Sequence, residues 1–256
     1  MGLNNQGPKA LVNYVLKQSK GKSEKLNYIL AIQGILAGIY ISLGAIGYFK
    51  IAASVSDKGI GNFLGAVVFP LGIIAIVVMK AELFTSDTMV MTSVYAGKIK
   101  FRKIFKILLI IFFSNMIGAV AIALITNASG IFSGNVMDMV IHKAIHKVHF
   151  PLAQLFFSSV LCNIIVCTAV CLAYSYSDEL SKVVVLWLGI TVFVLSGTEH
   201  VVANMYYLFT AYFGGANISL GGIAYNLVVA GIGNFIGGGI IVSGINYILA
   251  YKDIQI

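Results

Sequence analysis

The chain has 256 residues, of which 59% are hydrophobic and only 10% are charged, and its formal net charge is +8. Soluble domains carry about 25% charged residues, so this composition excludes an ordinary soluble domain and indicates lipid as the surrounding solvent. The basic residues gather in short segments beside apolar runs, which is typical of membrane orientation signals and argues against a nucleic-acid partner.

Apolar runs predict an all-α integral membrane protein with six membrane-spanning helices. Four of these helices are uninterrupted and reach the roughly 20 residues that a crossing needs. They are span one (26–49), span three (104–125), span four (151–174) and span six (222–250). The longest loop, 127–149, is expected to carry a short helix over 135–147.

Spans two and five are each predicted to break in the middle. The break in span two covers 80–87, and the break in span five covers 196–200. A kink is also expected at Pro70, within the first half of span two. The flanking half-spans cover 63–79, 88–95, 183–195 and 201–213.

The two breaks look alike in sequence. Each places a glutamate at the break, Glu82 or Glu199, and a carboxylate or amide five residues later, Asp87 or Asn204. An ionisable residue is costly in hydrocarbon and therefore predicts a functional site. Half-spanning helices at matching places predict an inverted 3+3 repeat around a central solute path.

We expect one channel domain over 1–256, divided at the loop between spans three and four. Its parts are a cytoplasmic segment (1–25), a first repeat (26–125), an extracytoplasmic loop (127–149) and a second repeat (150–251). The first segment is polar and lacks an apolar core, so span one is expected to act as the insertion signal. With the N-terminus inside, 12 basic residues fall on inner segments and 4 on outer ones, with Lys80 counted as intramembrane. Both termini are therefore predicted to be cytoplasmic.

The break sequences resemble the formate–nitrite transporter family over two stretches, 81–86 (AELFTS) and 196–205 (SGTEHVVANM). Supporting motifs follow in the same order along the chain: Phe69-Pro70-Leu71-Gly72, His146-Lys147 and Cys162-Asn163. The resemblance implies an aquaporin-like fold and a homopentamer in the cytoplasmic membrane, with one pore for small monovalent anions in each protomer. It implies neither an enzyme nor a cofactor. The chain as a whole looks most like the hydrosulfide-channel group, although no single residue encodes that preference, and formate and nitrite are also expected to pass.

The same resemblance assigns residues to the pore. The inner apolar constriction is expected from Leu83, Ile73 and Phe193, and the outer one from Phe84, Phe69 and Val166. Between them, Thr85 and His200 would offer hydrogen-bond donors to an anion stripped of water. Buried aromatic residues in a membrane protein more often only pack, so these assignments depend on the motif.

His200 is the histidine expected within a span, and a lone buried histidine is often only a packing residue. The adjacent Glu199, together with Asn163 and Asn204, favours a functional role because these groups can orient the ring and fix its tautomer. The chamber would hold either the anion beside a protonated His200 or the neutral acid beside a neutral His200. Both pairs cross an apolar constriction more cheaply than a bare anion.

Two lysines are assigned to vestibules. Lys147 is expected at the outer mouth, where a cation concentrates anions in a salt-dependent way; a solvated loop lysine is the alternative. Lys80 departs from the family pattern, and we expect it either to pair with Glu82 or to face the inner vestibule. His142 and His146 are four residues apart without the pattern of a zinc protease, so no metal site is assigned.

Other interpretations remain open at this stage. A proton-coupled carrier of the same anions would also use His200 and Glu199. An aquaporin-like channel for neutral solutes would share the fold, although the Asn-Pro-Ala repeat is missing from the sequence. The three cysteines, Cys162, Cys167 and Cys171, lie in span four and are interpreted as small packing residues.

Overall fold

The computed structural model describes residues 7–254, and every regular element in that range is a helix. The elements are α1 (Gly7–Glu24), α2 (Asn27–Ser54), α3 (Lys58–Val68), α4 (Leu71–Met79), α5 (Phe84–Asp87), η2 (Thr88–Met91), α6 (Thr92–Tyr95), α7 (Phe101–Ala128), α8 (Asn135–Val148), α9 (Leu152–Tyr174), α10 (Glu179–Leu195), α11 (Val201–Phe213), α12 (Leu220–Phe235), η3 (Ile236–Val242) and α13 (Ser243–Ile254). The predicted all-α class is confirmed.

Five helical stretches are long and apolar enough to cross a membrane. They are Asn27–Ser54, Lys58–Met79, Phe101–Ala128, Leu152–Tyr174 and Leu220–Tyr251. The fifth predicted span is not among them because its halves, α10 and α11, have only 17 and 13 residues. The short helix expected in the long loop is α8.

Span two is interrupted twice. The first interruption lies at Phe69 and Pro70, between α3 and α4, because a proline has no N–H to continue the helix ladder. The second follows Met79, as predicted, but α5 begins at Phe84 rather than at Thr88. The predicted break was therefore too long.

Glycines let the first and last spans of each half approach closely. In the first half, a Cβ on Gly38 of α2 would lie 2.1 Å from the backbone oxygen of Asn115 in α7. In the second half, a Cβ on Gly237 of η3 would lie 2.3 Å from the backbone oxygen of Val160 in α9. Neither position has room for a side chain. At these two positions the close packing lies within one protomer.

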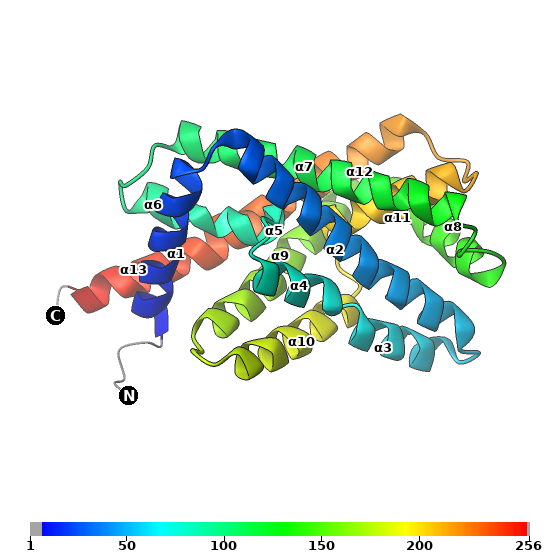
Figure 1. Ribbon diagram of the computed structural model, residues 1–256, viewed down its shortest axis with the longest axis horizontal. Coiled ribbons are helices and arrows are strands. Elements are labelled where there is room, and N and C mark those ends of the chain that lie inside the picture. Colours follow the sequence, from blue (N-terminus) through cyan, green and yellow to red (C-terminus); the bar gives the residue numbers. More distant parts are fainter. Residues whose placement is uncertain (1–6, 255–256) are drawn as a thin grey trace.

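The polar N-terminal segment forms a helix that the sequence analysis did not predict. Helix α1 buries Leu11, Val12 and Val15 and packs against α13. Figure 1 shows α1 and α13 at one end of the molecule and α8 at the other. We call these ends the α1 side and the α8 side. Residues 1–6 of the expected N-terminal segment lie outside the described range.

Candidate functional site

The first break is a short extended loop, held by an asparagine from a neighbouring helix. Lys80 ends α4 in the left-handed conformation, with φ of 54°. The side chain of Asn115 in α7 then holds both sides of Leu83. Its Nδ2 donates to the backbone oxygen of Glu82 at 2.9 Å, and its Oδ1 accepts from the backbone N–H of Phe84 at 2.9 Å.

The second break is held in the same way. Gly197 follows α10 with φ of 65°, a conformation that glycine adopts without strain. The side chain of Asn234 in α12 holds both sides of His200. Its Nδ2 donates to the backbone oxygen of Glu199 at 2.9 Å, and its Oδ1 accepts from the backbone N–H of Val201 at 2.9 Å.

Neither asparagine was among the predicted site residues. A signal was nevertheless present, because both begin the same short pattern, Asn-x-Ile-Gly, at 115–118 and at 234–237. Each pattern lies in the third span of its half. Comparing equivalent spans of the two halves would have found them.

His200 and Thr85 meet where the two breaks face each other. His200 Nε2 lies 2.9 Å from Thr85 Oγ1, and both side chains are buried. His200 Nδ1 accepts from the backbone N–H of Ala203 at 3.2 Å, so the ring also caps α11. Because Nδ1 is an acceptor, the hydrogen-bond network assigns the proton of the neutral ring to Nε2, which donates to Thr85. The Thr85 hydroxyl proton is then free to point elsewhere.

The residues that were expected to orient the His200 ring form hydrogen bonds with other groups. Glu199 Oε1 accepts from Lys147 Nζ at 2.6 Å, and Glu199 Oε2 accepts from Asn204 Nδ2 at 2.7 Å. Asn163 Nδ2 donates to the backbone oxygen of Thr85 at 3.1 Å. The ring is instead oriented by Thr85 and the Ala203 amide, so its expected orientation by Glu199 is wrong.

Lys147 is the last lysine of α8 and is only 9% exposed. Its ion pair with Glu199 and its position 5.7 Å from the ring centroid of Tyr207 place it beside the second break. The alternative of a solvated loop lysine is therefore wrong. Two cavities open next to it. A smaller one of about 50 Å³ reaches His200 and Phe193, and a larger one of about 240 Å³ is bordered by His142, Lys143, His146 and Glu199.

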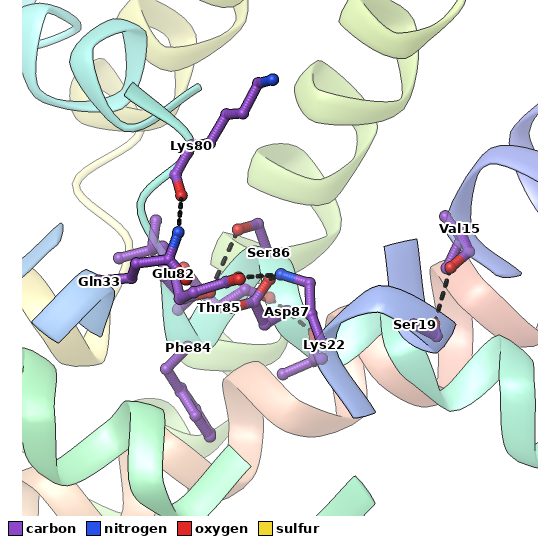
Figure 2. Close-up of polar contacts among 12 residues, drawn as sticks. Val15, Ser19, Lys22, Gln33, Lys80, Glu82, Phe84, Thr85, Ser86 and Asp87 are labelled. Atoms are coloured by element: carbon purple, nitrogen blue, oxygen red, sulfur yellow. Dashed lines mark hydrogen bonds and ion pairs between the residues drawn. The ribbon is translucent and has the colours of Figure 1, made fainter. Parts of the chain in front are cut away.

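Glu82 is paired with α1 and not with Lys80. Figure 2 shows the Lys80 side chain pointing away from the carboxylates, while the Lys80 backbone oxygen accepts from Gln33 Nε2 at 2.8 Å. Lys25 Nζ contacts Glu82 at 2.8 Å, and Lys22 forms ion pairs with both Glu82 and Asp87. The expected pairing of Lys80 with Glu82 is therefore wrong. The two break glutamates share a pattern: each pairs with lysine from a short helix, α1 or α8, at one end of the molecule.

Lys22 keeps its positive charge near neutral pH. Burial by itself would lower the pKa of Lys22, but attraction to Asp87 and Glu82 outweighs it, so the pKa lies above its ordinary value. Because the pKa of Lys22 is raised on folding, its ion pairs stabilise the docked α1 fully at every pH below the ordinary lysine pKa. This stabilisation is lost only as the pH rises through the pKa of the folded state. Titration of Lys22 therefore does not release α1 near neutral pH.

The predicted constriction residues are buried, but the aromatic ones group differently. The Phe69 and Phe193 rings lie 6.0 Å apart, and the Phe193 ring lies 5.4 Å from that of His200. The ring of Phe84 instead contacts that of Phe112 in α7, with the two ring centroids 5.1 Å apart. The two rings that were assigned to opposite constrictions are thus in contact with each other, and Phe193 also contacts the His200 ring. Their assignment to separate constrictions stays a prediction. The aliphatic members Leu83, Ile73 and Val166 are also buried, and their place in a constriction stays a prediction.

One of the cysteines lies against the site. Cys167 Sγ is 3.6 Å from the backbone oxygen of Thr85, which also accepts from Thr88 Oγ1 at 2.7 Å. A cysteine interpreted only as packing therefore helps to hold Thr85. Across residues 7–254, no cluster of three or more His, Cys, Asp or Glu side chains forms a metal site.

Comparison with known proteins assigns the family. The profile described as "Formate/nitrite transporter" matches residues 9–248. A formate channel of Bacillus thuringiensis, BtFdhC, is 30% identical over 96% of this chain and 95% of its own length. A solved structure titled "FNT family ion channel" has a TM-score of 0.87 at 26% identity, covering 94% of this chain and 98% of the other. Another, titled "Pentameric formate channel with formate bound", has a TM-score of 0.78 at 30% identity and covers 88% and 98%. The chain therefore belongs to the formate/nitrite transporter family of membrane channels.

Proposed function

We propose that the protein is a channel for the small monovalent anions of weak acids, with the contact between His200 and Thr85 at the centre of its path. The observation that carries the proposal is this buried 2.9 Å hydrogen bond between two broken spans, next to a cavity that opens on the α8 side. The path runs from that cavity past Phe193 and Phe69 to His200 and Thr85. It then passes Leu83 toward the ion pairs of α1.

The chemistry of the centre suits an anion that has lost its water. A bare charge is costly in an apolar passage, so it needs a hydrogen-bond donor or a proton at the narrowest point. Because His200 Nε2 donates to Thr85, the Thr85 hydroxyl proton is the donor offered to the anion.

Among the possible anions we favour hydrosulfide, with formate and nitrite as further substrates. A single donor at the centre matches an anion with one heavy atom, which needs no second hydrogen bond. The names of the relatives favour formate, so the ratio of the fluxes decides between the two. The lysine-rich loops support an orientation with both termini in the cytoplasm and α8 outside the inner membrane.

We further propose a homopentamer with one pore in each protomer. The apolar residues exposed on the long helices, such as Phe113 and Phe157, need lipid or neighbouring protomers to cover them. The mass of the detergent-solubilised complex tests this assembly, and a conducting monomer or trimer would contradict it.

Flux into proteoliposomes tests the function and the substrate together. Hydrosulfide, formate and nitrite are compared at equal gradients over a range of pH, with protein-free vesicles as the control for diffusion of the neutral acids. We expect all three to enter faster than in the control, and hydrosulfide to show the largest ratio. A formate flux that exceeds the hydrosulfide flux would overturn the preference, and no flux above the control would overturn the channel.

A further inference from the structure

We propose that Asn115 and Asn234 are matched positioning residues. On this proposal they hold the side chains that line the pore in position, because their hydrogen bonds fix the loops 80–83 and 196–200, which we call the pore loops. The inference rests on the proposed function, and it adds two residues that contact no permeating anion. Each asparagine belongs to the third span of its half and reaches across to the break in the second span of that half.

The contacts of the two side chains correspond one to one. Each Oδ1 accepts from the first backbone N–H of a half-helix, that of Phe84 or Val201. Each Nδ2 donates to the backbone oxygen of the break glutamate, Glu82 or Glu199. The second Nδ2 hydrogen goes to the first span of the same half, to the backbone oxygen of Gly34 at 2.8 Å or of Ser159 at 2.7 Å. Three elements are thus joined at one side chain in each half.

The chemistry explains why an amide stands at both places. A pore loop leaves a backbone N–H and a backbone oxygen without helical partners, and unmade hydrogen bonds in a buried site are expensive. One side chain must therefore both donate and accept. A carboxylate only accepts and would add a charge, and an aliphatic side chain does neither. Both asparagines are 0% exposed, so water does not substitute for them.

The hydrogen bonds that each asparagine makes to its pore loop, which we call a clamp, act on different parts of the path. Asn234 forms hydrogen bonds with the residues on either side of His200, so it fixes the ring relative to Thr85. Asn115 forms hydrogen bonds with the residues on either side of Leu83, so it fixes that apolar side chain at the first break. We therefore expect Asn234 to govern the pH response of the flux and Asn115 to govern the selectivity among anions.

Isosteric replacement separates these roles. Asn234→Asp and Asn115→Asp keep the acceptor for the half-helix N–H and lose both donors. Asn127→Asp is the matched control, because Asn127 lies on α7 and donates to the backbone oxygens of Ala123 and Thr210, away from both pore loops. In assembled variants, Asn234→Asp should slow formate flux about tenfold and change its pH profile. Asn115→Asp should change the hydrosulfide-to-formate flux ratio about threefold with an unchanged pH profile, and Asn127→Asp should change neither.

Hydrogen exchange on the wild-type complex tests the clamps without any variant. The amides of Phe84 and Val201 should exchange as slowly as those in the middle of α7. Fast exchange at these two amides would overturn the proposal, as would assembled Asp variants whose flux, ratio and pH profile match the wild type. If the wild type moves no anion, the proposed function fails, while protection of the two amides still supports the clamps.

Discussion

Replacing His200 with phenylalanine is expected to reduce anion flux by tenfold or more while the complex stays assembled. A hydrogen bond involving a charged group contributes roughly 1.5–3 kcal/mol, and each 1.4 kcal/mol corresponds to about a factor of ten. Phenylalanine removes the Nε2 donor that polarises Thr85. It also removes the Nδ1 acceptor that caps α11 through Ala203, and loss of a cap costs about 1 kcal/mol.

His200→Asn is the matched variant for this experiment. Asparagine is among the best N-cap residues, so α11 should keep its cap and the complex its stability. Asparagine also keeps a donor but does not titrate near neutral pH. We expect partial flux without the pH dependence of the wild type, measured in the same proteoliposome assay. If His200→Phe conducts like the wild type with the same pH response, His200 is only a packing residue and the proposed mechanism fails.

The second large effect is expected at Lys147, and the structure changes its interpretation. A solvated vestibule cation would lose its effect at high salt. Lys147 is instead buried in an ion pair with Glu199, and removing one partner of such a pair leaves an uncompensated charge, at a cost of about 3–5 kcal/mol. Lys147→Gln should therefore reduce flux by about a hundredfold at every ionic strength, because the unpaired Glu199 carboxylate also repels anions.

Two further variants distinguish the loss of the Lys147–Glu199 ion pair from the loss of a positive charge that attracts anions. Lys147→Gln combined with Glu199→Gln removes both charges and should recover much of the flux. Lys143→Gln is the control on the same helix, because Lys143 borders both cavities without an ion pair in the described part of the chain. Its loss should lower flux a few-fold at low salt and hardly at all at high salt, where screening removes the attraction. A salt-dependent loss in Lys147→Gln would show that Lys147 acts as a surface cation after all.

The sequence was enough to predict the helical class and the two breaks. These features are local: Glu82 and Glu199 interrupt apolar runs, and a polar residue in such a run has few explanations. Thr85 and His200 were expected to lie together only because the break motifs resemble the family, and the structure brings the two side chains into contact. The length of the first break could not be predicted, because α5 begins at Phe84, whose backbone N–H donates to the side chain of Asn115, a residue far along the chain.

Features that depend on docking were missed for the same reason. No local pattern in the polar segment 1–25 predicts that α1 docks beside the first break, where Lys22 forms ion pairs with Glu82 and Asp87. The adjacent Lys80 was therefore the natural but wrong partner for Glu82. The contact between the Phe69 and Phe193 rings was also not predicted, because it follows from how α3 and α10 pack and not from their order in the sequence.

The central claim is that anions cross through a continuous pore, and the reversal potential of the current across a planar bilayer tests it most directly. With formate at unequal concentrations and equal pH on the two sides, a channel carries a current that reverses at the Nernst potential of formate and saturates weakly. A carrier that moves one proton with each anion is electrically silent. We predict reversal at the formate potential, with the current lost in His200→Phe. The absence of current in the bilayer, together with formate flux that follows an imposed proton gradient in proteoliposomes, would contradict the account.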